Sequence, residues 1–369
     1  MLKKITYMAA IQYASMAIII LLAKTTTSSN SQPIPSDKSK VESWFQNTIK
    51  PLAVRKSTLN SSLTAAEAKP IIIKVRKDGS GKFKTLTEAI ASIPTGNFQR
   101  LIIDIGPGKY VEKLTIDRSK PFVTLRGSPG NKPILSFDGT AKKFGTVYSA
   151  TLQVFGDFFV ASNIVFENTA PKPDGKMEGA QAVALRIGGD KAAFYNCRFL
   201  GFQDTVCDDQ GRHFFKDCYI QGTVDFIFGS GKSLYLNTVL NVVESHARVT
   251  VITAGARDSP NQDQVYSFVH CKVQGDAKGS FLGRPWTHMP RVVFAYTELG
   301  SNVHPEGWST FNHPERAQTV SFGEYKCSGP GSNFKGRPKF VKKLTDSQAQ
   351  PYLSLQFIDA STWLLPHPK

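Results

Sequence analysis

The stretch Phe194-Tyr195-Asn196-Cys197 recurs 21 residues later as Phe215-Lys216-Asp217-Cys218, and this repeat decides the fold. Each copy begins with an aromatic residue, continues with two variable positions and reaches a small residue, which a variable and then an apolar residue follow. Four further segments obey the same rule: Phe159-Val160-Ala161-Ser162, Tyr235-Leu236-Asn237-Thr238, Phe268-Val269-His270-Cys271 and Phe294-Ala295-Tyr296-Thr297. Successive small residues are separated by 35, 21, 20, 33 and 26 positions. The chain therefore contains an internal repeat.

A repeat near 21 residues with longer excursions predicts a coiled stack of strands, in which each turn adds one rung and loops of variable length bulge outward. Neighbouring strands in such a stack lie about 4.8 Å apart. A fold of alternating strands and helices would need amphipathic helices between the repeats, and gaps of 20 and 21 residues leave little room for them. We therefore expect an all-β fold, a parallel β-helix.

The repeat also gives a structural explanation for most of the five cysteines. Cys197, Cys218 and Cys271 occupy its small position, so we interpret them as core residues rather than catalytic thiols. A disulfide between Cys197 and Cys218 stays open, because adjacent rungs bring Cα atoms within the permitted range of about 4.4–6.8 Å. Two more cysteines, Cys207 and Cys327, make the count odd and leave at least one thiol without an intramolecular partner.

Composition allows one large domain and an acidic partner. The chain has 369 residues, 41% of them apolar, which suffices for a sizeable core. The formal charge of +16 is typical either of a solubilising surface or of a protein that binds an acidic polymer. The sign of the charge alone does not distinguish a nucleic acid from a polyuronate as that polymer. No nucleic-acid-binding motif is present, so we expect no nucleic acid partner.

The N-terminal region divides into two parts before the β-prone sequence begins. Lys3-Lys4, the apolar run 5–23 and the polar residues after it predict a secretory signal peptide over residues 1–23, although a run of 19 residues also allows an uncleaved membrane anchor. Residues 24–69 are polar and are interpreted as a leader or linker that carries a glycosylation acceptor at Asn60. We expect the catalytic β-helix domain over residues 70–369, with one early helix over Thr85–Ile93 that Pro94 ends.

The repeat period also gathers polar side chains. Gln181 and Gln203 are 22 positions apart, and Asp204 and Asp225 are 21 apart, so a stack of this period places two carboxylates and two carboxamides on one sheet face. Two facing carboxylates are a common hydrolytic arrangement, provided that their environments keep one ionised and the other protonated. The alternative is that these four side chains belong to solvent-facing strand or turn residues. The apolar Phe226-Ile227-Phe228 directly after Asp225 weakens this alternative.

A cation and an indole follow in Leu282-Gly283-Arg284-Pro285-Trp286. The planar guanidinium of Arg284 can hold a carboxylate through two hydrogen bonds. Trp286 offers a flat apolar face of the kind that packs on sugar rings. Taken singly, the two residues are also compatible with a surface salt bridge and a core indole.

Four blocks of the chain resemble the signature motifs of the plant pectin methylesterases, or pectinesterases, in the right order. They are Gln181-Ala182-Val183-Ala184-Leu185-Arg186, Gly201-Phe202-Gln203-Asp204-Thr205, Gly222-Thr223-Val224-Asp225-Phe226-Ile227-Phe228-Gly229 and Leu282-Gly283-Arg284-Pro285-Trp286. The segment Gly108-Lys109-Tyr110-Val111-Glu112 resembles a weaker motif. The likeness extends from about Ile71 to Leu365. It implies a right-handed parallel β-helix that hydrolyses the methyl esters of homogalacturonan to pectate and methanol and so modifies the plant cell wall.

The resemblance also implies roles for individual residues. Asp225 is similar to the family's nucleophile, Asp204 to its proton donor, and Gln203 to its transition-state stabiliser with Gln181 beside it. Arg284, Trp286 and Thr151 resemble substrate-binding residues. Phe202 and Val206 depart from the family's frequent Tyr and Leu, and neither departure removes a group that the chemistry needs. Residues 24–69 are too few for the helical inhibitor-like pro-domain of many members, so the chain resembles the short form.

These interpretations predict an enzyme that forms an aspartyl acyl-enzyme and uses no metal or cofactor. We expect it to be a monomer, secreted to the extracellular cell wall, with pectin as substrate and a proteinaceous pectinesterase inhibitor as a candidate partner. Two rival classes remain. One is another pectin-acting β-helix, a polygalacturonase or pectate lyase, against which the pairing of carboxamides with carboxylates argues. The other is a non-enzymatic wall-binding protein, against which the intact Asp204, Asp225 and Arg284 argue.

Overall fold

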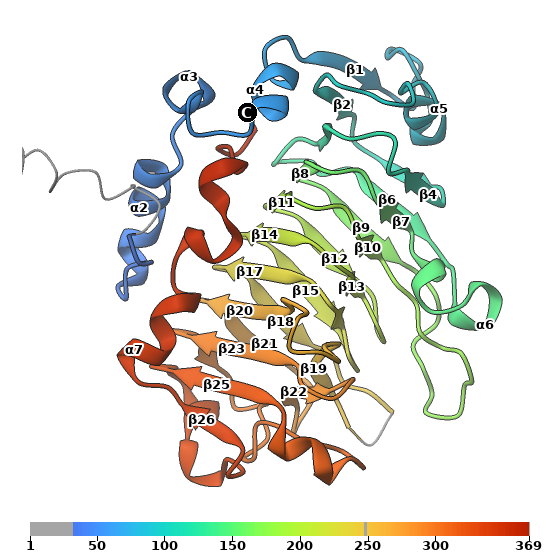
Figure 1. Cartoon of the computed structure of the whole chain (residues 1–369). Coiled ribbons are helices and arrows are strands. Elements are labelled where there is room, and N and C mark those ends of the chain that lie inside the picture. Colours follow the sequence, from blue (N-terminus) through green and yellow to red (C-terminus); the bar gives the residue numbers. More distant parts are fainter. Residues whose placement is uncertain (1–31, 247–248, 369) are drawn as a thin grey trace, which may run out of the picture.

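Three parallel sheets wind around one apolar core in a computed structural model that describes residues 32–246 and 249–368. Every pairing between strands of these sheets is parallel, and from β7 to β24 the chain visits the three sheets in strict rotation (Figure 1). Each full turn of the chain thus adds one strand to every sheet. The predicted right-handed parallel β-helix is confirmed.

The strands of each sheet are as follows. The long sheet contains β1 (Ile71–Val75), β2 (Leu101–Ile105), β5 (Val123–Arg126), β8 (Val160–Ser162), β11 (Ala192–Tyr195), β14 (Arg212–Lys216), β17 (Lys232–Leu236), β20 (Val265–Val269), β23 (Arg291–Ala295), β25 (Ser321–Tyr325) and β26 (Val341–Lys343). The eight-stranded sheet contains β3 (Lys109–Val111), β6 (Ile134–Phe137), β9 (Val165–Asn168), β12 (Arg198–Leu200), β15 (Tyr219–Gly222), β18 (Val239–Val242), β21 (Lys272–Gly275) and β24 (Glu298–Leu299). The seven-stranded sheet contains β4 (Leu114–Ile116), β7 (Leu152–Val154), β10 (Leu185–Ile187), β13 (Val206–Asp208), β16 (Ile227–Gly229), β19 (Val251–Gly255) and β22 (Phe281–Pro285).

Helices lie outside this stack. The α-helices are α2 (Val41–Thr48), α3 (Leu52–Arg55), α4 (Ser61–Ala66), α5 (Leu86–Ala91), α6 (Ala141–Phe144) and α7 (Asp346–Ala349). The 3-10 helices are η2 (Lys38–Lys40), η3 (Val147–Ser149), η4 (Pro314–Gln318), η5 (Pro330–Ser332), η6 (Phe334–Gly336), η7 (Gln350–Tyr352), η8 (Leu355–Ile358) and η9 (Ala360–Thr362).

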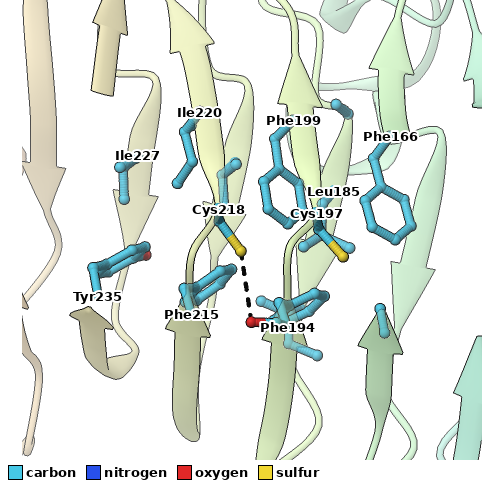
Figure 2. Close-up of a cluster of buried hydrophobic side chains, with 14 of the residues drawn as sticks. Phe166, Leu185, Phe194, Cys197, Phe199, Phe215, Cys218, Ile220, Ile227 and Tyr235 are labelled. Atoms are coloured by element: carbon cyan, nitrogen blue, oxygen red, sulfur yellow. Dashed lines mark hydrogen bonds between the residues drawn. The ribbon is translucent and has the colours of Figure 1, made fainter. Parts of the chain in front are cut away.

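The aromatic residues of the repeat form a continuous stack inside the coil. The rings of Phe194, Phe215, Tyr235, Phe268 and Phe294 are fully buried, and successive centroids are 4.6, 4.5, 4.5 and 4.5 Å apart. These separations are close to the spacing of neighbouring strands, so each ring packs on the ring of the next coil. Figure 2 shows the first three of them in a row across neighbouring strands. Five of the six predicted repeat segments are therefore in register.

The sixth segment is shifted by two residues from its prediction. Phe194 pairs with Ala161 of β8, so Phe159 lies two positions too early to belong to the stack. A left-handed residue follows each long-sheet strand from β8 to β25 and marks the register: Asn163 has a φ of 58° and Asn196 a φ of 50°. Asparagine tolerates this conformation better than most residues. The side chain of Asn196 also donates to Oδ1 of Asn163 over 2.8 Å.

The cysteines of the repeat are buried free thiols, as their core interpretation requires. Cys197, Cys218 and Cys271 are at most 2% exposed. Sγ of Cys218 lies 3.5 Å from the carbonyl oxygen of Phe194 on the previous coil, the contact drawn dashed in Figure 2. The alternative of a disulfide between Cys197 and Cys218 is not realised, because both sulfur atoms are free in the structure.

The predicted early helix is present as α5. Thr85 caps it and forms a reciprocal capping box with Glu88, which satisfies two of the free backbone N–H groups at the helix start. Leu86, Ala89 and Ile90 are buried in the main core. The helix therefore covers apolar residues at the first coil of the stack.

The prediction that residues 24–69 are a linker is wrong from residue 32 onward. Helices α2 to α4 lie in this region, and their apolar side chains pack against the outer face of the long sheet. Val41, Trp44 and Phe45 have the i, i+3, i+4 spacing of a buried helix face, a signal that the polar average composition obscured. Asn60 caps α4, so the glycosylation acceptor lies within the folded body rather than before it.

The expected signal peptide, residues 1–23, lies outside the described residues, as do residues 24–31 of the expected linker. No helix between residues 32 and 246 or 249 and 368 is long and apolar enough to cross a membrane.

Candidate active site

The two predicted carboxylates lie side by side on consecutive coils. Asp204 precedes β13 and Asp225 precedes β16, and the strands pair with Val206 opposite Ile227. The backbone N–H of Asp204 donates to the carbonyl oxygen of Val224 over 3.0 Å. Both aspartates adopt left-handed backbone, with φ of 66° and 52°, and both residues are only 3% exposed. The prediction that they share one face of the sheet agrees with this geometry.

Arg284 closes the site from a later coil. Its Nε donates to Oδ1 of Asp225 over 2.8 Å, and its Nη2 donates to Oδ2 of the same carboxylate, so the contact is a two-pronged fork. Strand β19 lies between β16 and β22, and Ala254 is the partner of both Phe228 and Arg284 in register. A small residue at this place lets the long side chain cross the intervening strand to reach Asp225.

The two carboxyl groups have different electrostatic environments. Burial raises the pKa of Asp204 well above its usual range, and the negative charge of Asp225 raises it further, against a smaller opposing effect of Arg284. Oδ1 of Asp204 is buried without a hydrogen-bond partner in the described part of the chain. Asp225, by contrast, has its charge offset by the guanidinium fork. The site therefore contains one carboxyl group whose ionisation is disfavoured by burial, beside a second carboxyl group that a guanidinium orients.

The two carboxamides lie beside this pair, with an offset of one position between them. Because Leu185 pairs with Val206, Gln203 is opposite Ala182 rather than Gln181, and the backbone N–H of Ala182 donates to the carbonyl oxygen of Gln203 over 3.1 Å. Both glutamines are half-buried. Within residues 32–246 and 249–368 neither carboxamide is engaged by another protein group. Both are therefore able to donate to a bound molecule.

The floor of the site is apolar. Cys207, Phe228 and Ala254 follow one another in register across β13, β16 and β19, and they belong to a small buried cluster separate from the main core. Burial raises the pKa of the Cys207 thiol well above its usual range, which keeps this thiol neutral. An apolar cluster next to charged groups strengthens the electrostatic interactions between them.

Of the two remaining predicted residues, Trp286 is exposed and Thr151 is buried. Its side chain is 48% exposed, and the Arg284 guanidinium lies over its ring, 4.9 Å from the centroid. Thr151 is fully buried, and its hydroxyl donates to the carbonyl oxygen of Glu167 over 2.8 Å. It has no free surface for a substrate, so the prediction for Thr151 is corrected to a structural role.

Two residues near the site were not predicted. The Arg284 guanidinium also lies over the ring of Phe311, with Cζ 5.2 Å from the ring centroid, and Arg316 donates to the carbonyl oxygens of Pro285 and Trp286. Both come from a loop outside the repeat and outside the motifs. The only sequence signal is an aromatic residue soon after Trp308, which by itself carries no information about the site.

Comparison with known proteins agrees with the fold. The family model described as Pectinesterase matches residues 72–361. Pectinesterase 2 of Olea europaea is 51% identical over 349 residues, which are 94% of this chain and 95% of that protein. The solved pectin methylesterase from carrot is 30% identical, with a TM-score of 0.75 over 80% of this chain and 95% of that one. A pectin methylesterase solved in complex with hexasaccharide VII is 28% identical, with a TM-score of 0.68 over 81% of this chain and 99% of that one.

These matches span most of the chain and of each relative, and they include all the predicted motifs. The chain belongs to the pectinesterase family of enzymes.

Proposed function

We propose that this enzyme hydrolyses the methyl esters of homogalacturonan through an acyl-enzyme on Asp225. In the first step an oxygen of Asp225 attacks the ester carbonyl carbon, and the oxyanion that forms accepts hydrogen bonds from Gln181 and Gln203. The carbon–oxygen bond to the methoxy group then breaks, and Asp204 donates its proton to the departing methanol. Water attacks the resulting acyl-enzyme, Asp204 takes a proton from it, and the pectate carboxylate leaves Asp225.

One observation carries this proposal: the two adjacent carboxyl groups differ in their partners. Asp225 has both oxygens on Arg284, which aims the carboxylate, whereas Asp204 is buried beside it with a raised pKa and no cation of its own. This difference separates a nucleophile from a proton donor. A polygalacturonase would leave the two unengaged carboxamides without an oxyanion to stabilise, because its transition state resembles an oxocarbenium ion.

The substrate class is supported by the relatives. The carrot and hexasaccharide-bound structures are pectin methylesterases by description, and the chain covers nearly the whole of both. The half-exposed indole of Trp286 beside the site offers a face for a sugar ring. We extend the proposal to secretion, to action in the cell wall as a monomer, and to a proteinaceous pectinesterase inhibitor as a partner.

The decisive measurement is methanol release from methyl-esterified pectin by Asp225→Asn. The substitution is nearly isosteric and removes the nucleophile, so we expect no detectable methanol with an unchanged circular dichroism spectrum. Asp263→Asn is the matched control, because Asp263 is an exposed acid paired only with Lys232 on another surface. Substantial methanol release by a folded Asp225→Asn protein would contradict the mechanism. Chain shortening or unsaturated products from the wild type would instead assign a glycosidase or a lyase.

A further inference from the structure

The guanidinium of Arg284 lies over two aromatic rings. Its Cζ is 4.9 Å from the ring centroid of Trp286 and 5.2 Å from that of Phe311. Attraction between a guanidinium and a ring face strengthens when water is largely excluded, and the Arg284 side chain is only 17% exposed. The same guanidinium makes the fork to Asp225. Phe311 is thus in direct contact with the group that aims the proposed nucleophile.

The segment that carries Phe311 is fixed against β22. The backbone N–H of Leu282 donates to the carbonyl oxygen of Gly307 over 2.6 Å, and that of Ser309 donates to Gly283 over 3.2 Å. A Cβ atom at Gly283 would lie 2.9 Å from the Trp308 ring, so only glycine lets this indole pack so closely beneath the strand. The Trp308 indole N–H in turn donates to Glu324 over 3.0 Å.

Two further features place the Phe311 ring. Phe311 has a left-handed backbone with a φ of 53°, which is uncommon for a bulky residue, and its N–H donates to Oγ of Ser309 over 2.9 Å. Arg316, in η4, donates to the carbonyl oxygens of Pro285 and Trp286 over 3.2 and 3.0 Å. The loop is therefore bonded to the Leu282–Trp286 motif on both sides of Phe311. A strained backbone held by its surroundings in this way is typical of functional sites.

We propose that Phe311 is a positioning residue, which with Trp286 forms an aromatic clamp that holds the Arg284 guanidinium on Asp225. This inference rests on the proposed roles of Asp225 and Arg284. If one of the two rings were missing, the Arg284 side chain would be free to adopt other rotamers. With both rings present, the fork is held in the geometry that aims the carboxylate. Phe311 is 38% exposed, so a competing role for it is that of a second contact for a sugar ring. The experiment below distinguishes this role from the positioning of Arg284.

The test compares steady-state kinetics of Phe311→Ala and Phe311→Trp with the wild type. We expect Phe311→Ala to lower kcat about tenfold, an effect of the size of one cation–aromatic contact, with KM changed less than about twofold. Phe311→Trp keeps a ring face and should recover kcat to within about threefold of the wild type. Phe98→Ala, which removes an 81% exposed phenylalanine elsewhere, is the control and should match the wild type.

A double-substitution cycle tests the coupling to Arg284 directly. In an Arg284→Lys background the planar guanidinium is absent, so Phe311→Ala should lower kcat further by less than about twofold. An equal effect in both backgrounds overturns the proposal, as does a raised KM at unchanged kcat, which would make Phe311 a sugar contact. If Asp225→Asn is inactive and Phe311→Ala behaves as the wild type, only the clamp is refuted. Activity of Asp225→Asn would refute the proposed function itself.

Discussion

Asp204 is the side chain whose ionisation the fold disfavours. Burial raises its pKa well above the ordinary 3.8 in the folded protein, whereas in the unfolded chain it titrates near that value. As the pH rises above about 4, the unfolded state loses this proton first, and unfolding becomes progressively more favourable until the folded group also ionises. Asp204 therefore lowers stability at neutral pH and has no such effect below about pH 3.

We expect Asp204→Asn to abolish methanol release and to melt at or above the wild-type temperature at pH 7. The amide cannot ionise, so the cost of a buried acid disappears. The advantage should vanish at pH 3, where the wild-type carboxyl is protonated in both states. Calorimetry at the two pH values measures this, with Asp263→Asn as an exposed control. A difference that is independent of pH would contradict the argument.

Arg284→Lys tests the fork rather than the charge. Lysine keeps the positive charge and loses the planar pair of donors, so Asp225 would no longer be aimed. We expect turnover to fall roughly a hundredfold, as for a misplaced reacting group, while the melting temperature changes little because Arg284 is at the edge of the site. Methanol release near the wild-type rate would show that a point charge suffices.

The residues of the site could be predicted because the repeat period and the motifs agree on them. The contact of Arg284 with Asp225 spans 59 positions, and it was expected because a planar guanidinium can hold a carboxylate through two hydrogen bonds. The period could not reveal that Gln203 is opposite Ala182, because a spacing of 22 residues and one of 21 differ by a single step of register. Thr151 was misplaced because a hydroxyl can bond either a ligand or a nearby carbonyl, and only the structure shows that it bonds Glu167.

The N-terminal helices and the C-terminal segment form one covering layer on the long sheet. In Figure 1 the red C-terminal segment runs beside the long-sheet strands, and α2 lies next to it. Arg55, which is 6% exposed, ties the two together by donating to the carbonyl oxygens of Ala360, Ser361 and Leu364. The carbonyl oxygen of Ala360 also accepts from the backbone N–H of Leu364 over 2.9 Å, so removal of Arg55 should leave the carbonyl oxygens of Ser361 and Leu364 unpaired.

We expect Arg55→Met to lower the free energy of unfolding by at least about 3 kcal/mol, since it breaks several charged hydrogen bonds at once. The site is remote, so methanol release per folded molecule should be unchanged. Lys56→Met is the matched control, because Lys56 is exposed on the neighbouring position. Denaturant titration of both variants measures the effect. Equal stabilities would mean that the N-terminal layer is held by apolar packing alone.

The sequence predicted strands better than it predicted this layer. Stacked aromatic residues at one period leave a visible pattern, and five of the six segments were aligned correctly from it. The segment at Phe159 failed because the register follows Asn163, which the pattern treated as a variable position. The helices before residue 70 failed because their buried faces are short and are interrupted by polar residues that face solvent.

At the scale of the whole molecule, positive charges greatly outnumber negative charges. The chain has 45 basic and 29 acidic residues, and loss of residues 1–23 would remove two lysines and leave a formal charge of 16 − 2 = +14. The excess is uneven along the fold. Residues 325–345, at the end of the stack, contain no acid, and their exposed cations include Lys335, Lys339, Lys342 and Lys343. The lysines of the edge strand β26 also discourage pairing with another chain, so this charge has a structural explanation as well.

Salt separates the two explanations of the basic surface. If it attracts a polyanion, binding to demethylated pectin should weaken steadily as salt rises from 0.05 to 0.5 M, because the Debye length is about 8 Å at 0.15 M and shortens further above it. Demethylated pectin has no ester to hydrolyse, so the wild-type enzyme can be measured by sedimentation with the polymer. An uncharged galactan is the control and should show no dependence on salt. Binding to pectate that is equally strong at both ends of this range would mean that the surface charge serves solubility and that the contact is made by the cleft alone.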